Sequence, residues 1–424
     1  MTKKKWPRGV AVVGAGMSKF GAFPEKTSRD LFVDAFIELQ ENVDKGLDPE
    51  KIEAFYVGNF SSDQFEKQSH LAPILANWIG LSPISAVRVE DACASGAVAF
   101  RQAALAIASG EYDVVLVGGI EKMTDLHIAA VTEALATAAD TQFEIPAGFT
   151  FPGFYAAMAT AYMAKYNAPR EAFYHVSIKN HKNGALNEKA QFGQTIFEIM
   201  ESKKDRAAKK GRPVPEWQDE IEFLSDPKGN PNIAWPMALF DCSPVSDGGA
   251  VVLLVAEDIA KEYTDIPLYL VGSGQASDGA LPERDTLASI PAAEEAAKQA
   301  YDMAELGPDD VDLAEVHDCF TIAEIMAVED LGLFPRGEGW KAAMEGKTAR
   351  DGEMPVNTSG GLKSKGHPVG ASGIGQINEI WKQLRGIAGD RQLSGNPKIG
   401  LTHNVGGSGQ TCVVNIFERR DSNE

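Results

Sequence analysis

The chain repeats its own order of motifs about 260 positions further on, and this repetition constrains the fold more than any other feature. The segment VGAG at 13–16 returns as VGSG at 271–274, and an amphipathic segment follows each copy. LDPEKIEAFYVGNF, which ends at Phe60, is matched later by LGPDDVDLAEVHDCF, which ends at Phe320. The succession of strand, glycine turn, helix, acidic turn and strand therefore occurs twice, which predicts two copies of one folding unit.

The expected strands of these units are short and almost entirely apolar. YDVVLVGG from Tyr112 and GAVVLLVAE from Gly249 are examples, and each lies next to an alanine-rich helical stretch. Such runs are typical of strands that are covered on both faces. Their alternation with helices predicts the α/β class, with each half built in layers.

Differences in amino-acid composition along the chain indicate where its domains begin and end. We expect an N-terminal half formed by 1–120 plus 241–265 and a C-terminal half formed by 266–424. Between them, 121–240 is rich in aromatic and charged residues, which predicts an inserted lid or loop subdomain. A charged excursion near 201–232 contains two lysine pairs, which we interpret as solvated surface.

Composition excludes several classes of function. The 424 residues include 60 acidic and 40 basic side chains, a formal net charge of −20, which opposes broad binding to nucleic acid or an anionic membrane. We find no apolar run near the roughly 18 residues that a membrane span needs, and we interpret the first apolar segment as a strand, not a signal peptide. That segment is not a dinucleotide-binding loop, because Lys19 stands where the third glycine belongs.

The four cysteines contain no C-x-x-C pair, so neither a zinc ribbon nor a thioredoxin-type motif is expected within this chain. Free thiols at this low density indicate a reduced, cytoplasmic protein. No cluster of histidine, cysteine and acidic residues has metal-binding spacing, and we predict no metal site.

Cys93 lies where an apolar and acidic lead-in ends and a helix of small residues begins. A thiol at a helix N-terminus faces unpaired N–H groups and the positive end of the helix dipole, and both favour the nucleophilic thiolate. Ala94, Ser95 and Gly96 leave room for a bulky substrate. Since many cysteines are simply small core residues, a structural role stays open at this point.

His367 lies in NTSGGLKSKGHPVG, a glycine-rich loop that leads into a helix. A neutral imidazole can take a proton from a thiol or donate to a developing oxyanion. A purely structural loop histidine is the alternative. So many glycines cost backbone entropy, which indicates a close approach to another part of the molecule.

Two further segments carry groups suited to the same chemistry. EVHDCF at 315–320 places His317 and Cys319 two apart at the end of an expected strand, so both should point to one side. A thiol beside an imidazole is a candidate proton carrier. THNVGGSGQT at 402–411 adds His403 and bare N–H groups that could form an oxyanion hole. A buried Cys–His pair and a simple turn between strands are the structural alternatives.

Taken together, the segment at Cys93, H-D-C-F at 317–320, GHPVG at 366–370 and NVGGSG at 404–409 resemble the thiolase superfamily over nearly the whole chain. The H-D-C-F pattern is similar to the sterol-carrier-protein and archaeal-type branch, which includes acetoacetyl-CoA and benzoylsuccinyl-CoA thiolases. Most other thiolases have Asn-Glu-Ala-Phe there and a second catalytic cysteine where this chain has His403.

The resemblance implies duplicated five-layer α-β-α-β-α halves and thiolytic cleavage of a 3-oxoacyl-CoA, or the reverse Claisen condensation, through a cysteine acyl-enzyme. It implies Cys93 as nucleophile, His367 as its base and Cys319 as the acid/base that handles the substrate carbon and the CoA thiol. His317 would assist the enolate oxygen. The turn at Val405 and Gly406 would supply oxyanion N–H groups, and the role of His403 stays open.

The resemblance also implies CoA as a substrate, no tightly bound cofactor, a homodimeric core and, in this branch, a separate small OB-fold, zinc-ribbon partner. Two other functions remain open from the sequence. One is a thiolase-fold condensing synthase of the ketoacyl or hydroxymethylglutaryl-CoA type, since His317, His367 and His403 permit a Cys–His–His set. The other is a non-catalytic acyl-CoA-binding subunit of a complex.

Overall fold

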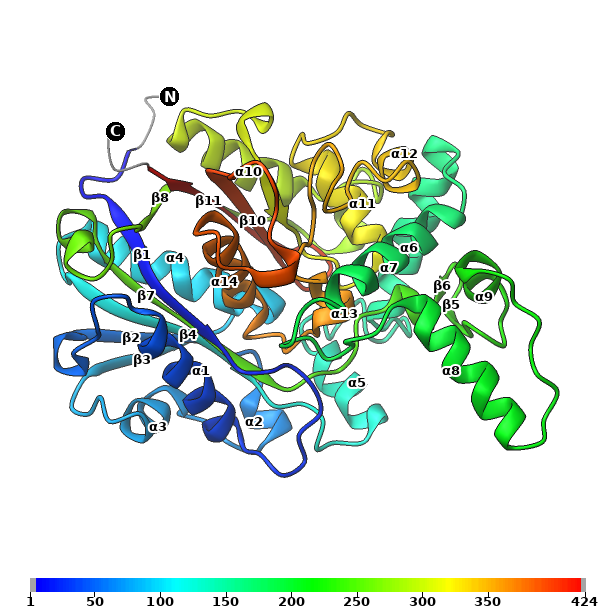
Figure 1. Ribbon diagram of the computed structural model, residues 1–424, viewed down its shortest axis with the longest axis horizontal. Coiled ribbons are helices and arrows are strands. Elements are labelled where there is room, and N and C mark those ends of the chain that lie inside the picture. Colours follow the sequence, from blue (N-terminus) through cyan, green and yellow to red (C-terminus); the bar gives the residue numbers. More distant parts are fainter. Residues whose placement is uncertain (1–4, 421–424) are drawn as a thin grey trace.

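The computed structural model describes residues 5–420, which form two similar α/β halves and a protruding segment between them (Figure 1). The strands of the first half are β1 (Val10–Met17), β2 (Ala54–Gly58), β3 (Ser85–Val89), β4 (Val114–Glu121) and β7 (Gly248–Ala256). Those of the second half are β8 (Leu268–Ser277), β9 (Leu313–Glu315), β10 (Ile399–Gly406) and β11 (Thr411–Arg419).

The strand order repeats the duplication seen in the sequence. The strands form one continuous sheet in the order β3-β2-β4-β7-β1-β8-β11-β10-β9. Outward from the β1–β8 junction, the order is β1, β7, β4, β2 in the first half and β8, β11, β10, β9 in the second. In both halves the first two pairings of this series are antiparallel and the third is parallel. In the second half an isolated bridge between Ala314 and Val356 stands where β3 stands in the first. The predicted duplication of an α/β unit is thus visible in the topology.

The helices form layers on the faces of the strands. The helices of the two halves are α1 (Ser28–Asn42), α2 (Ser62–Phe65), α3 (Leu71–Trp78), α4 (Ser95–Ala108), α10 (Pro291–Ala304), α11 (Thr321–Asp330), α12 (Gly339–Met344), α13 (Gly361–Lys365) and α14 (Ser372–Leu384). Along β1, Val10 and Val12 pack with α4 and α14, whereas Ala11 and Val13 pack with α1, because successive side chains point to opposite faces. On the second half, α10 packs against β8 and β11. Helices α4 and α14 contact each other between the two halves of the sheet. The five layers are thus α1 with α3, the strands of the first half, α4 with α14, the strands of the second half, and α10.

Glycine permits the close approach of the two central helices. A side chain on Gly58 would meet the backbone of Gly96 at 2.5 Å, and one on Gly96 would meet the Gly370 carbonyl oxygen at 2.6 Å. A side chain on Gly373 would meet the Ala97 nitrogen at 2.7 Å. The start of α4 is thereby pressed against the loop and first turn of α14, and the two glycine-rich motifs of the sequence meet in space.

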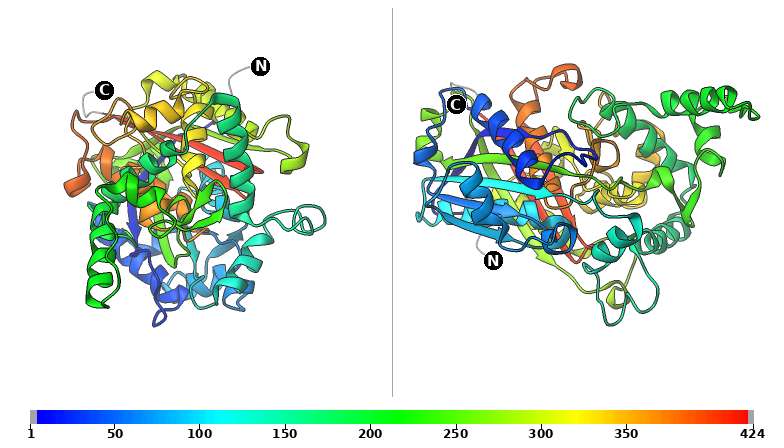
Figure 2. Two further views of the ribbon diagram at one scale, coloured as in Figure 1. Left: turned by 90° about the vertical axis from the view of Figure 1, so that its right-hand side faces the viewer. Right: turned by 90° about the horizontal axis from the view of Figure 1, so that it is seen from below.

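The chain between β4 and β7 is mostly helical and partly leaves the body of the molecule. It contains α5 (Ile128–Ala136), α6 (Phe151–Tyr166), α7 (Glu171–Gly184), α8 (Ile196–Lys209), α9 (Glu220–Ser225) and a hairpin of β5 (Asn232–Ala234) and β6 (Met237–Ala238). Helices α6 and α7 pack on the second half, whereas α8, α9 and their connection project outward (Figures 1 and 2). The exact domain boundaries given above stay a prediction. Within the described residues, no helix has both the length and the apolar character to cross a bilayer.

Candidate active site

Cys93 lies on a tight turn between β3 and α4. Residues Ala92–Ala94 form one 3-10 turn that continues into the helix, and Ala92 has φ +49°, a left-handed conformation that is uncommon for a residue with a side chain. Ser95 stabilises the turn, since its Oγ accepts from the Asp91 N–H at 2.8 Å and donates to the Ala92 carbonyl at 2.6 Å. The turn leaves Cys93 partly exposed at the front of α4.

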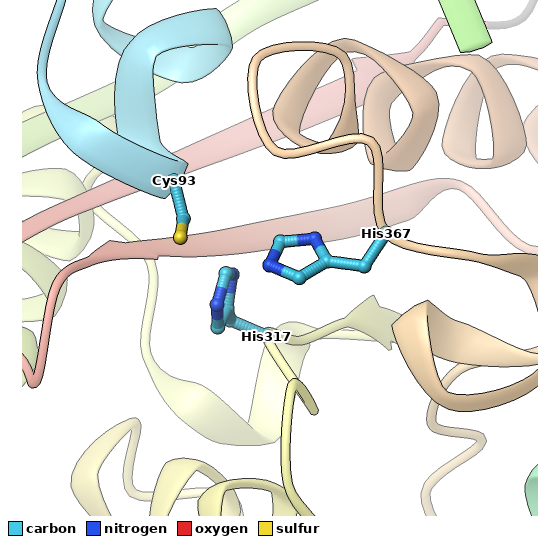
Figure 3. Close-up of side chains that lie close together, drawn as sticks. All are labelled: Cys93, His317 and His367. Carbon is cyan, nitrogen blue, oxygen red and sulfur yellow. The ribbon is translucent and has the colours of Figure 1, made fainter. Parts of the chain in front are cut away.

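Two histidines from the second half face this thiol. One nitrogen of His317, one of His367 and the Cys93 Sγ all lie within 4.8 Å of one another (Figure 3). The two imidazole rings meet edge to face, with centroids 5.1 Å apart. Residues separated by more than two hundred positions therefore converge on one sulfur at the junction of the halves.

The hydrogen bonds of His367 fix its tautomer. Its Nδ1 lies 2.7 Å from Ser372 Oγ, and that hydroxyl donates its own proton to the Pro368 carbonyl at 2.9 Å. Nδ1 must therefore carry a proton and donate to Ser372, which leaves the lone pair on Nε2. Burial lowers the pKa of His367 to about 3, so the ring is neutral at physiological pH. A neutral imidazole with a free Nε2 can accept a proton from a thiol.

His317 has the opposite tautomer. Asn404 Nδ2 donates to its Nδ1 at 3.0 Å, so the ring proton is on Nε2. Nε2 is buried and has no hydrogen-bond partner among residues 5–420. Burial holds the pKa of His317 well below its usual value, and a positive charge on His317 would also be opposed by any charge on His367 or His403. His317 is thus a neutral donor beside Cys93, ready for an acceptor oxygen.

The electrostatics of Cys93 correct one sequence-based expectation. Cys93 as a residue is partly exposed, but protein atoms surround its sulfur; this burial raises the pKa of the thiol to about 12, and the charge of Glu121 adds to the effect. N–H groups of Gly407 and of Cys93 itself act in the opposite direction. The helix start was expected to favour the thiolate, but removal of the sulfur from water outweighs these donors. The resting pair is accordingly a neutral thiol and a neutral imidazole.

Cys319 lies in the same site, but the expectation that it shares a strand with His317 was wrong. Strand β9 ends at Glu315, so period-two alternation does not extend to His317 and Cys319. A turn between β9 and α11 places them instead. Cys319 is buried, it contacts the Tyr155 hydroxyl, and it lies close enough to Cys93 that a negative charge on one sulfur would oppose ionisation of the other. Burial raises the pKa of this thiol well above its usual value.

The glycine-rich turn places one N–H at the Cys93 sulfur, and the oxyanion role expected of Val405 and Gly406 stays a prediction. Val405 and Gly406 belong to β10 and pair with Cys412 and Thr411 of β11. The N–H that reaches the Cys93 sulfur is that of Gly407, the first residue of the turn. Gly407 has φ +61°, a conformation that favours glycine.

His403 lies outside the Cys93 cluster. Its Nδ1 accepts the backbone N–H of His317 at 3.3 Å, which helps to hold that segment. Burial lowers the pKa of His403 to about 3, so its ring is neutral.

Sequence reasoning missed several residues that orient the site. Ser372 follows His367 by five positions, and Asn404 stands inside the glycine-rich motif, so both could have been found as polar residues beside the chosen ones. Tyr155 is one of several aromatic residues in its segment, and no pattern distinguishes it. The atoms of Cys93, His317 and His367 form the one group among residues 5–420 whose spacing could hold a metal ion. We assign them to acyl transfer, and the absence of a metal site stays a prediction.

Two similar α/β halves with a cysteine and two neutral histidines at their junction define a class: the cysteine-dependent acyltransferases. Residues 10–258 match the family "Thiolase, N-terminal domain", and residues 274–419 match "Thiolase C-terminal domain-like". The chain therefore belongs to the thiolase family, and it is an acyltransferase with thiolase activity.

Named relatives agree with this assignment. The chain is 44% identical to an acetyl-CoA acetyltransferase of Methanothermobacter thermautotrophicus, over 97% of this chain and 100% of that protein. It is 31% identical to the benzoylsuccinyl-CoA thiolase subunit BbsB of Thauera aromatica, over 95% and 96%. It is 30% identical to sterol carrier protein 2 of Bos taurus, over 96% and 72%. The branch expected from the H-D-C-F motif is confirmed.

A solved structure, titled Ltp2-ChsH2(DUF35) aldolase, is similar in fold. Its TM-score is 0.77 at 23% identity, with 99% of this chain and 100% of that chain covered. The expected fold class is thereby confirmed.

Proposed function

We propose that the protein cleaves a 3-oxoacyl-CoA with CoA, or runs the reverse condensation, through an acyl group on Cys93. The observation that supports this most is the convergence of Cys93, His317 and His367 within 4.8 Å. His367 Nε2 accepts the proton of Cys93, and the thiolate attacks the 3-keto carbon of the substrate. The N–H groups of Cys93 and Gly407 stabilise the tetrahedral oxyanion.

The second part of the proposal assigns the carbon–carbon cleavage. Collapse of the tetrahedral adduct leaves an acyl group on Cys93 and releases a CoA-ester enolate. His317 Nε2–H and the protonated His367 donate to the enolate oxygen, while the Cys319 thiol gives its proton to the enolate carbon. Losing one such donor typically costs roughly 3–4 kcal/mol of barrier.

The cycle then closes with CoA. The Cys319 thiolate accepts the proton of the incoming CoA thiol, and the CoA sulfur attacks the thioester on Cys93. Cys93 leaves as a thiolate and recovers its proton from His367. Every group returns to its starting state, and the acyl group leaves as its CoA ester.

Two substitutions test these roles. Cys93→Ala should abolish the covalent mass increase that substrate produces on the wild-type protein; a normal adduct in that variant removes Cys93 as nucleophile. Cys319→Ala should still acquire the acyl group but lose turnover. Undiminished turnover would transfer the acid/base role to another group, such as Cys412 or His403.

A condensing synthase is the second candidate, because Cys93 with His317 and His367 is also the Cys–His–His set that such enzymes use. Cys319, buried beside Cys93, favours the thiolase over the synthase. CoA-dependent loss of the enolate absorbance of a 3-oxoacyl-CoA distinguishes them, since a thiolase gives it and a synthase or a non-catalytic subunit does not.

The proposal extends to assembly and location. We expect a cytoplasmic protein with a homodimeric core and a small OB-fold, zinc-ribbon partner subunit. The words "subunit" and "DUF35" in the names of BbsB and of the Ltp2-ChsH2 complex support a partner. Co-purification of a tagged chain from its own cells, with mass identification of any small companion, tests this expectation.

A further inference from the structure

Tyr155 is a buried hydroxyl in the site to which the proposed cycle gives no task. It lies on α6, in the inserted segment, and its side chain is fully buried. Its ring stacks on Phe320, the neighbour of Cys319, with centroids 4.5 Å apart and planes 22° apart. This stacking holds the hydroxyl in place beside the Cys319 thiol.

The same hydroxyl has a second acceptor. Tyr155 Oη lies 3.4 Å from the carbonyl oxygen of Gly407, a long and weak hydrogen bond. The N–H of that glycine reaches the Cys93 sulfur. Arg284 holds the next residue of the turn, since its Nη1 donates to the Ser408 carbonyl at 2.9 Å. The hydroxyl therefore stands between the acid/base thiol and the turn that serves the nucleophile.

The charged groups around this pair come from several elements. A negative charge on Cys93, across the site, or on the neighbouring Asp318 would raise the pKa of Cys319. Tyr155 interacts with both thiols and with the Arg284 guanidinium. Two contacts favour a negative charge on Cys319, the phenol O–H of Tyr155 and the backbone N–H of Phe320, and the phenol is the side chain of the two.

We propose that Tyr155 is the positioning residue for Cys319, and that its O–H turns from the Gly407 carbonyl to the Cys319 sulfur whenever that sulfur is a thiolate. The inference rests on the proposed role of Cys319. When Cys319 gives its proton to the enolate carbon, a thiolate forms in an apolar pocket, and the Tyr155 O–H donates to it. When the CoA thiol returns a proton to Cys319, the O–H turns back to Gly407. Tyr155 keeps its own proton throughout.

Tyr155→Phe tests this role because it removes the hydroxyl and keeps the ring that stacks on Phe320. We expect acylation of Cys93, followed by intact mass, within about threefold of wild type. In single turnover, transfer from acyl-Cys93 to CoA should slow at least about tenfold at neutral pH. The rate of this transfer rises with pH, and the pH at which it rises should be about one to two units higher than in the wild type. A hydrogen bond to a charged group is strong enough to cause a shift of that size.

Tyr162→Phe is the matched control. Tyr162 lies on the same helix, is equally buried and donates to Glu329, away from both thiols. It loses a buried hydroxyl too, so the control measures what such a loss does to the fold alone. We expect it to keep the wild-type pH profile of acyl transfer, even if its melting temperature falls.

The outcomes separate this inference from the proposed function. A wild-type protein that shows neither acylation nor thiolysis overturns the proposed function. A working wild type with an unshifted pH profile in Tyr155→Phe overturns the role of Tyr155 alone, as does an equal shift in Tyr162→Phe. If Tyr155→Phe does not fold, Tyr155→Met fills the same space without a hydrogen-bond donor, and a pH profile left at the wild-type position in that variant also overturns the proposal.

Discussion

Gly96→Ala should disable the enzyme, although the same change stabilises most helices. Gly96 is the second residue of α4, and alanine exceeds glycine in helix propensity by about 1 kcal/mol. However, the new methyl group would lie 2.6 Å from the Gly370 carbonyl oxygen, whereas ordinary contact begins at 3.4 Å. The missing distance, about 0.8 Å, must come from movement of α4 away from the loop that carries His367.

The magnitudes decide the direction of the effect. Overpacking of this kind costs about 1–3 kcal/mol, which exceeds the gain in helix propensity. The opposing atom is backbone, so no rotamer change relieves the contact. A shift of about 1 Å between reacting groups costs roughly 100-fold in rate. We therefore expect kcat to fall about 100-fold and the melting temperature to fall slightly.

The assay is thiolysis of a 3-oxoacyl-CoA, with thermal unfolding measured on the same samples. Gly193→Ala is the control, because a side chain there would meet nothing within 4 Å. It should keep wild-type activity. If Gly96→Ala keeps kcat within about threefold of wild type, the contact between α4 and the His367 loop does not set the catalytic geometry, and the reasoning fails.

Three further predictions follow from the same geometry. Asn404→Leu removes the donor to His317 Nδ1 and frees the ring to exchange tautomers, so kcat should fall about tenfold or more. 15N NMR of the histidines should show a mixture of the Nε2–H and Nδ1–H forms of His317, whereas an unchanged spectrum contradicts the assignment. Because burial raises the pKa of Cys93 to about 12, the thiol form predominates below that pH. The rate of alkylation of Cys93 in the free enzyme should therefore rise about tenfold per pH unit from neutrality to about pH 10. A rate that is constant near neutral pH would reveal a thiolate–imidazolium pair instead. Dialysis against a chelator should leave thiolysis unchanged, because the proposed steps need no metal, and lost activity restored by a divalent cation would oppose the assignment of the cysteine and two histidines to acyl transfer.

The local chemistry of each motif could be predicted from residue types alone. A cysteine before a run of small residues, a histidine among glycines and a second thiol next to a histidine each limit what their segment can do. The repetition of motifs also predicted the duplication, because each half must fold by the same pattern of apolar runs. These features depend on the order of residues along the chain, which a sequence records completely.

Predictions that required distances in space were less accurate. Burial reversed the expected ionisation of Cys93, because desolvation depends on everything packed around the sulfur and not on its own helix. The N–H that reaches the Cys93 sulfur is that of Gly407, whereas Val405 and Gly406 pair with β11, and the glycine-rich motif does not distinguish these positions. Tyr155 entered the site from the inserted helices, which no local pattern in its segment indicated.

The order of residues thus determined that the chain builds one layered unit twice and equips both copies with groups for acyl transfer. Tertiary structure alone decided which of these groups share a pocket, which nitrogen of each imidazole holds its proton and how strongly burial opposes charge. The physical reason is that bonding and patterning act over a few residues, whereas solvation and hydrogen-bond partners depend on segments brought together from more than two hundred positions apart.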